Sequence, residues 1–304
     1  MRYIHSLLPF LSKPMIFGQS IHQSFILGHN ILFTIYKFIA IFSLRKRNFM
    51  SSILIEKREK GIVVLTIDSP GKQNAFNASM LEELQTTLER LKKNKDIKIL
   101  YITGSGDKSF SAGVFLKDLV EFADPAEARV YAELLESTMD RLFNFPKPVI
   151  ALINGYALGG GFGIAMSSDI RIMTENAVIG FPAVRIGAIL PAGCTYRLLE
   201  LAGAGKAKEL LLTGRHVKSD EALNMGLVNY VVKDRESLFA KADEISEQIL
   251  QASGHALAMT KATVNQHTNE LIYRYSLYSS DNFAYLFTTK DWKERIDSFL
   301  KRKN

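Results

Sequence analysis

The chain has 304 residues, of which 47% are hydrophobic and 23% are charged, and its formal net charge is +7. This composition is typical of a globular protein that buries at least one large core, and it excludes the disordered and fibrous classes. The single cysteine, Cys194, excludes an intramolecular disulfide and is typical of a reducing compartment.

The positive charge is concentrated at the start of the chain. Residues 1–49 contain six of the 38 basic residues and none of the 31 acidic ones. The remaining chain is therefore nearly neutral. Because a nucleic-acid-binding domain usually carries a clustered excess of Lys and Arg, we expect no nucleic-acid partner.

Residues 1–49 form a leader with three possible interpretations: a transit peptide, a weak membrane anchor, or sequence upstream of a true start at Met50. The apolar stretch 25–44 is interrupted by His29, Asn30 and Lys37, which disfavours a membrane span. An acid-free, basic and serine-containing segment fits a transit peptide. We expect a cytoplasmic protein, or a mitochondrial one if the leader is a genuine transit peptide.

The first half of the remaining chain alternates strands and helices. β-Branched residues predict strands over 53–58 and 62–68, on either side of a turn at Lys60-Gly61. Asn77 is expected to cap a helix over 78–93, where apolar residues recur at helical spacing. A strand follows over 97–103.

The second half continues this alternation and then becomes helical. We expect a helix over 125–143, a strand over 147–153, a glycine run, a helix over 161–167, and strands over 169–173 and 177–180. Helices dominate from Thr195 onward. The pattern predicts an α/β core over 50–255 followed by a helical region over 256–304. We expect this helical region to take part in oligomerisation.

Two segments are candidates for chemistry. Residues 109–114 read Ser-Phe-Ser-Ala-Gly-Val, and residues 155–161 read Gly-Tyr-Ala-Leu-Gly-Gly-Gly between a strand and a helix. Glycine allows a ligand to approach the main chain closely. A dinucleotide-binding loop would need glycine in place of Ala157, and a P-loop would need Gly-Lys-Ser/Thr where Phe162 follows. Both nucleotide-binding interpretations are therefore excluded.

Five motifs together resemble the crotonase superfamily, also called the enoyl-CoA hydratase/isomerase family, over residues 52–304. They occur in the family's order and are Asn74-Ala-Phe, 110–119 (Phe-Ser-Ala-Gly-Val-Phe-Leu-Lys-Asp-Leu), 147–172 around the glycine run, 212–228 and the closing helix 287–302. The resemblance implies a spiral of ββα units with a C-terminal α-helical region. It also implies a homotrimer or a dimer of trimers.

The resemblance further implies an oxyanion hole for the thioester carbonyl of an acyl-coenzyme A. Its two donors fall on the backbone N–H groups of Val114 and Gly160, where they would stabilise an enolate. No permanently bound cofactor and no metal are expected, since coenzyme A arrives as part of the substrate. The residues expected to bind substrate are Ala112, Gly113, Phe115, Lys72, Gly159, Gly161 and Arg185.

The sequence departs from the family's hydratases at two positions. Their two acid–base glutamates would fall on Gly163 and Ala183. Hydration needs a base for water and an acid for the α-carbon. The Gly163 pattern resembles that of 4-chlorobenzoyl-CoA dehalogenases, but the nucleophilic aspartate of those enzymes would fall near Pro191. Dehalogenation therefore lacks its nucleophile.

Other polar groups lie near the expected pocket, and we expect the acids among them to be solvated on helix faces. These candidates are Asp118, Glu121, Glu133, Glu136, Tyr131 and Arg185. The C-terminal aromatic residues are expected to pack a subunit interface; they are Phe283, Tyr285, Phe287 and Trp292.

The sequence therefore predicts an acyl-CoA enzyme that stabilises an enolate, with double-bond isomerisation or hydration as its activity. Isomerisation requires fewer protein groups, because one base can move a proton between two carbons. Two alternatives stay open: decarboxylation of an acyl-CoA on the same fold, and a non-catalytic protein that binds acyl-CoA.

Overall fold

The structure is a computed structural model and describes residues 52–120, 122 and 124–301. The expectations for the leader over 1–49, and for the cellular location that depends on it, lie outside the described residues. Glu121 lies outside them as well.

A six-stranded sheet forms the centre of the fold, in the order β1-β2-β3-β5-β7-β10. β1 is antiparallel to β2, and the other neighbours pair in parallel. Five of the six strands predicted from the sequence fall within this sheet, and β10 was not predicted. Its strands are β1 (Ser52–Lys57), β2 (Ile62–Asp68), β3 (Ile99–Gly104), β5 (Val149–Ile153), β7 (Ile170–Thr174) and β10 (Tyr230–Val232).

A second, four-stranded sheet has the order β4-β6-β8-β9. Its strands are β4 (Ser109–Ser111), β6 (Tyr156–Leu158), β8 (Val178–Gly180) and β9 (His216–Lys218). β4, β6 and β8 are parallel, and β9 is antiparallel to β8. Each strand has only three residues, too few to show an alternating pattern, so the sequence predicted only β8.

The helices that surround the sheets have clear local causes. The Asn77 side chain accepts a hydrogen bond from the Met80 N–H at 2.9 Å and caps α2, as predicted. Asp124 caps α4 in the same way. The α-helices are α2 (Ala78–Lys93), α3 (Leu116–Val120), α4 (Pro125–Phe143), α5 (Gly160–Met166), α6 (Ala192–Thr213), α7 (Ser219–Asn224), α8 (Arg235–Leu250), α9 (Gly254–Thr288) and α10 (Lys290–Lys301), and the 3₁₀ helices are η2 (Glu59–Gly61) and η3 (Pro182–Ile186).

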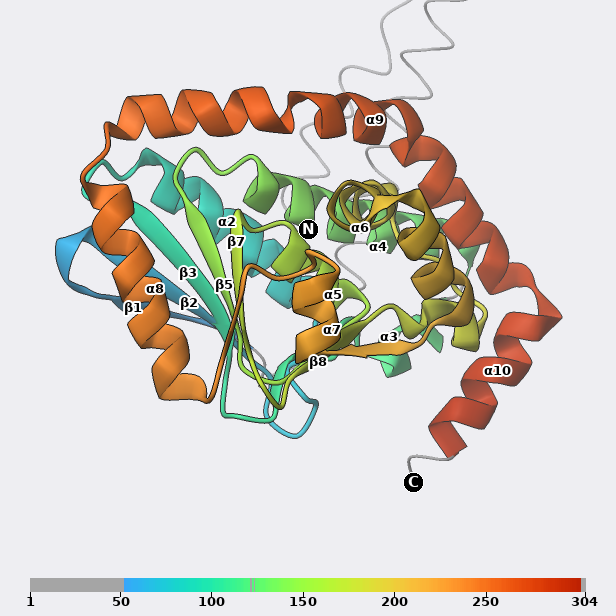
Figure 1. The fold of residues 1–304 in the computed structure, drawn as a ribbon. Helices are drawn as coiled ribbons and strands as arrows, with labels where there is room; N and C mark the ends of the chain where they lie inside the picture. Colours follow the sequence, from blue (N-terminus) through green and yellow to red (C-terminus); the bar gives the residue numbers. More distant parts are fainter. Residues whose placement is uncertain (1–51, 121, 123, 302–304) are drawn as a thin grey trace, which may run out of the picture. The chain divides into compact units, whose positions relative to one another are not determined.

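The large sheet is buried on both faces, because successive side chains of a strand point to opposite sides. In β2, Val63 and Leu65 face the main core with α2 and α4, whereas Ile62 and Val64 face α8. Figure 1 shows α8 beside the sheet and α9 passing along α4 and α6. This arrangement confirms the predicted α/β class.

The C-terminal aromatic residues form a cluster within the chain. The Phe287 ring lies 4.9 Å from Phe283 and 4.3 Å from Trp292, and Phe283 and Trp292 are buried. The expectation of a subunit interface is wrong for these two residues, because they close α9 and α10 onto the chain's own core. Tyr285 is exposed.

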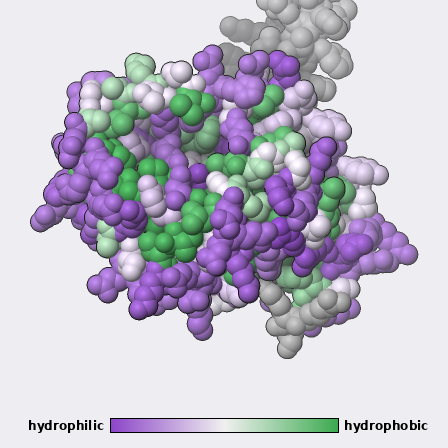
Figure 2. All heavy atoms as spheres, in the orientation of Figure 1, coloured by the Kyte–Doolittle hydropathy of each residue, from purple (hydrophilic) through white to green (hydrophobic). Residues whose placement is uncertain are grey.

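Hydrophilic residues cover most of the face seen in Figure 2, and hydrophobic ones are gathered near its middle. None of the helices within residues 52–301 has both the length and the apolar character needed to cross a bilayer.

Candidate active site

The pairing of β4 with β6 brings the two glycine-containing segments together. Ser111 is in register with Ala157, and the strands run in parallel. Their carboxyl ends therefore meet at one edge of the small sheet. Gly113 then lies directly against Gly160, since a Cβ atom built on Gly113 would be 2.9 Å from the Gly160 nitrogen.

The backbone around Val114 is held by Phe76. The Phe76 N–H donates to the Gly113 carbonyl at 2.7 Å, and the Phe115 N–H donates to the Phe76 carbonyl at 2.8 Å. Backbone groups alternate in direction along an extended chain, so the Val114 N–H points away from Phe76. Among the described residues, no hydrogen bond is donated by this N–H group.

The Gly160 N–H is also unpaired among the hydrogen bonds of the described chain. Gly160 is the first residue of α5, and the first N–H groups of a helix have no partner within it. Gly163 makes the first helical bond, to the Gly159 carbonyl at 3.0 Å. Gly159 itself has φ 53°, a conformation that favours glycine. The site thus places two unpaired donors on adjoining segments.

Buried polar side chains fix the loop that carries Val114. The Ser111 hydroxyl donates to the Asn74 carbonyl at 2.7 Å and accepts from the Gly113 N–H at 3.1 Å. The Asn74 side chain in turn donates to the carbonyls of Ser105 and Ser109. Asn74 is one of two consecutive residues with positive φ, a strained arrangement that these bonds stabilise.

Gly161 allows the two segments to touch. A Cβ atom there would lie 2.1 Å from the Ser111 carbonyl oxygen, so no side chain fits. Lys72 and Phe115 lie at the edge of the same loop, with the Lys72 ammonium 4.5 Å from the centre of the Phe115 ring. The structure therefore groups Lys72, Ala112, Gly113, Val114 and Phe115 around the adjoining glycines.

Arg185 lies elsewhere. Its side chain is exposed, and its Nε donates to the Thr213 carbonyl at 3.1 Å. The carbon stem packs against Gly214, where a Cβ atom would be 3.1 Å from Arg185 Cγ. No described contact joins Arg185 to the two glycine segments, because residues 182–186 form a 3₁₀ helix rather than the extended chain assumed from the sequence.

Position 163 is enclosed by apolar groups. A Cβ atom on Gly163 would lie 2.6 Å from Cys194 Sγ and 2.6 Å from Met139 Cε. Cys194 is fully buried, and burial raises the pKa of its thiol. This thiol is therefore a packing group.

A buried carboxylate lies next to these residues. Glu136 is only 6% exposed, and both of its carboxylate oxygens accept from the Gly193 N–H, at 2.9 and 3.2 Å. Burial raises the pKa of Glu136 to about 7, with a further increase from Asp140, while the Gly193 hydrogen bond and Arg197 act in the opposite direction. The expectation of a solvated acid is wrong for Glu136.

Arg197 was not singled out from the sequence, yet it is one of the largest fully enclosed side chains. It is 2% exposed, its Nη2 pairs with Asp140 at 2.6 Å, and its guanidinium lies over the Phe143 ring at 4.4 Å. Its Nε and Nη1 have no partner among the described residues. Asp118 is also buried, at 7% exposure, which corrects the expectation for that acid.

The pH dependence of stability should report the buried Glu136. Its folded-state pKa of about 7 lies above the ordinary glutamate value of 4.5, so the folded state binds more protons and stability falls as pH rises through this window. Glu136→Gln removes this loss. The variant should therefore gain stability relative to the wild type as the pH rises. From pH 5 to pH 8, we expect the free energy of unfolding of the variant minus that of the wild type to increase by about 3 kcal/mol.

Denaturant titrations at the two pH values measure this shift. Glu89→Gln is the matched control, because Glu89 of α2 forms a surface ion pair with Arg141 of α4, the helix that carries Glu136, and both side chains are about two-fifths exposed. An equal difference at pH 5 and pH 8 for Glu136→Gln would contradict the assignment of the raised pKa.

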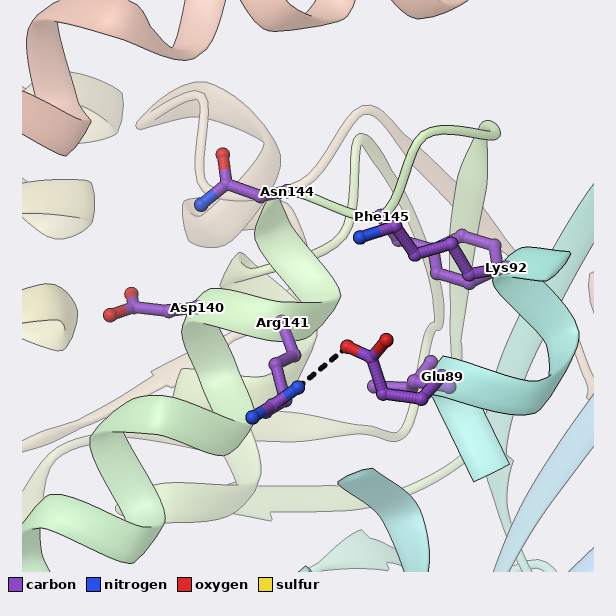
Figure 3. A pocket seen from close by; sticks show the side chains of 7 residues that line it. Glu89, Lys92, Asp140, Arg141, Asn144 and Phe145 are labelled. Carbon is purple, nitrogen blue, oxygen red and sulfur yellow. Dashed lines mark hydrogen bonds and ion pairs between the residues drawn. The ribbon is translucent and has the colours of Figure 1, made fainter. Parts of the chain in front are cut away.

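Two surface depressions lie outside the glycine segments. One, of about 260 Å³, lies between α2 and α4, where the Glu89–Arg141 ion pair crosses it and Asp140 points away from that pair (Figure 3). The other, of about 520 Å³, lies between α3, the start of α4 and the α9–α10 corner. Within the described chain no group of His, Cys, Asp and Glu could hold a metal ion.

The sequence was compared with protein families and with known proteins to identify the family to which the chain belongs. The enoyl-CoA hydratase/isomerase family matches residues 57–304. The chain belongs to this family. It is 36% identical over 254 residues to the short-chain-enoyl-CoA hydratase of Clostridium acetobutylicum, covering 84% of this chain and 96% of that protein. It is 38% identical to the crotonyl-CoA hydratase of Syntrophomonas wolfei, covering 83% and 96%.

The solved structures agree with this membership. The human mitochondrial delta3-delta2-enoyl-CoA isomerase superposes with a TM-score of 0.77 at 25% identity, over 82% of this chain and 97% of that one. The crotonase fold and the family predicted from the sequence are therefore confirmed. The family membership also identifies the chain as one of the proteins that act on CoA thioesters.

Proposed function

We propose that the protein stabilises the enolate of an acyl-CoA thioester between the N–H groups of Val114 and Gly160. The contact between Gly113 and Gly160, with both of these N–H groups unpaired in the described chain, carries the proposal. A thioester oxygen gains negative charge when the α-carbon loses a proton. Fixed donors that point at this oxygen stabilise the charge, at roughly 3 kcal/mol for each donor.

Double-bond isomerisation is the reaction that fits best. Hydration requires two acid–base groups, and the positions where the family's hydratases have glutamates hold Gly163 and Ala183 here. Met139 and Cys194 occupy the space beside Gly163. This apolar surrounding also supports decarboxylation as a second candidate, since the departing carboxylate then supplies the electrons and no base is needed.

Residues around the proposed oxyanion hole of Val114 and Gly160 are suited to bind coenzyme A. Lys72 lies over Phe115 next to the oxyanion segment, where an ammonium can meet a phosphate. Ala112, Gly113, Gly159 and Gly161 offer main chain at close approach. We assign no substrate contact to Arg185, since its guanidinium donates to the Thr213 carbonyl at the end of α6.

The depression between α3 and the α9–α10 corner is the candidate site for the acyl chain. Its walls include Leu119, Phe122, Phe287 and Trp292. The Phe122 ring lies 5.7 Å from Tyr131, whose hydroxyl donates to the Phe76 carbonyl at 3.4 Å. Phe76 in turn holds the Val114 segment, so a chain of buried contacts joins the wall of this depression to the proposed oxyanion hole.

We further propose a homotrimer or dimer of trimers assembled through α9. Large side chains are exposed along this helix, more than a monomer needs on a single element. They are Met259, Val264, Tyr273, Leu277, Tyr278 and Tyr285, each at least 64% exposed. Light scattering of the purified protein tests this, and a monomer at micromolar concentration would contradict it.

The reaction is tested with a panel of 3-enoyl-, 2-enoyl-, 3-hydroxyacyl- and malonyl-type CoA esters in deuterated water, followed by mass spectrometry. We expect 3-enoyl thioesters to convert to 2-enoyl thioesters with deuterium uptake. Loss of CO₂ from the malonyl-type ester alone would select decarboxylation. Binding without any product or exchange would contradict the proposed catalysis.

A further inference from the structure

Glu136 occupies the junction of three helices next to the proposed oxyanion hole. On α4, its neighbour Leu135 lies 3.6 Å from a Cβ built on Gly160, and Met139 fills the space beside Gly163. Cys194 of α6 closes the same space, and the adjacent Gly193 holds the Glu136 carboxylate. The carboxylate therefore lies beside the face of α5 from which the hydratase glutamate is missing.

We propose that Glu136 is the group that takes and returns the substrate proton, a role that rests on the proposed function. Its carboxylate forms an O–H bond with a proton from the α-carbon of a 3-enoyl thioester. The electrons of that C–H bond spread to the thioester oxygen at Val114 and Gly160. Protonated Glu136 then gives the proton to the γ-carbon, and the double bond moves without water, oxidant or a second base.

Gly193 of α6 packs directly against the carboxylate of Glu136. A Cβ atom at position 193 would lie 2.2 Å from Glu136 Oε1 and 2.7 Å from Arg197 Nη1, so any residue other than glycine would displace the carboxylate. The Gly193 N–H fixes the direction of the carboxylate while leaving a lone pair on each oxygen. Arg197 acts on this carboxylate, but no described residue forms a close ion pair with it.

The charges around Glu136 are suited to proton transfer at neutral pH. Asp140 of the same helix and Arg197 of α6 act on it in opposite directions, and Cys194 also faces it. α5 contributes only glycine and apolar residues. On α9, Glu270 and Arg274 pair with each other at exposed positions. With a pKa raised to about 7 by burial, Glu136 can both accept and return a proton near pH 7.

The experiment follows 3-hexenoyl-CoA in deuterated buffer, with conversion and deuterium uptake measured by mass spectrometry from pH 5.5 to 8.5. For the wild type, we expect the rate to rise as the pH rises through about 7, because the ionised carboxylate is the base. Glu136→Gln keeps an acceptor for the Gly193 N–H and should fold. We expect it to lower the rate at least about 100-fold while thioester binding stays unchanged.

Two further variants separate the outcomes. Glu136→Asp keeps a carboxylate and should retain more activity than Glu136→Gln, whereas Glu89→Gln should match the wild type. If Gly160→Pro abolishes conversion but Glu136→Gln does not, the proposed function stands and the Glu136 assignment is overturned. If the wild type neither binds nor converts the thioester, the proposed function itself fails.

Discussion

Gly160→Pro is expected to lower turnover of a CoA thioester at least about 100-fold, because proline has no N–H to donate. The change is conformationally mild. Gly160 is the first residue of α5, a position at which proline is well tolerated, and its own N–H makes no hydrogen bond within the described chain. The loss should therefore appear in kcat with little effect on folding, as measured by steady-state kinetics and thermal unfolding.

Gly160→Ala is the matched control. It keeps the N–H, and its Cβ would meet Leu135 Cδ1 at 3.6 Å and Gly113 Cα at 3.7 Å, which are ordinary contacts. We expect Gly160→Ala to retain most of the wild-type activity. An equal loss in both variants would show that crowding, and not the missing donor, explains the effect, and the oxyanion assignment would then be wrong.

Local patterns predicted helices α2 and α4 and most strands of the large sheet, whereas α6, α8 and α9 were expected only as a helical second half. The helix over 78–93 has the expected bounds and cap, since its apolar spacing and Asn77 are both visible in the sequence. The small sheet was mostly missed, because its three-residue strands depend on pairing between segments far apart in the chain. Such short strands have no pattern of their own, and only the tertiary structure defines them.

In the candidate site, too, the sequence indicated local motifs but not the contacts between segments that are far apart in the chain. The family resemblance directed attention to Val114 and Gly160, but it gave no sign that Phe76 and Asn74 hold the intervening loop. Glu136 looked like a surface acid, since a polar residue on a helix is usually exposed. The buried carboxylate accepts a hydrogen bond from Gly193, which lies on a different helix and 57 residues later in the chain. The sequence placed Arg185 beside the substrate because residues 182–186 were assumed to be extended. They form a 3₁₀ helix, and the Arg185 side chain is exposed.

Gly163→Glu introduces a glutamate at the position where the resemblance to the family's hydratases places one, and it is expected to destabilise the protein by at least about 3 kcal/mol. Its Cβ alone would lie 2.6 Å from both Cys194 Sγ and Met139 Cε, in a fully buried position. Overpacking of a core typically costs about 1–3 kcal/mol, and a carboxylate enclosed by sulfur and methyl groups adds the cost of an unpaired charge. Urea titration measures the loss, and hydration of crotonyl-CoA should not appear.

Gly163→Glu combined with Met139→Ala separates the cost of overpacking from the cost of the unpaired buried charge. Truncating Met139 removes the Sδ and Cε atoms that crowd position 163, so part of the lost stability should return. The carboxylate would still face buried Cys194, and it would lie near Glu136, another acidic group. The double variant should therefore stay less stable at pH 8 than at pH 5, because two neighbouring carboxyl groups resist ionisation together. If Gly163→Glu alone proves as stable as the wild type, the close packing around α5 does not exist in solution.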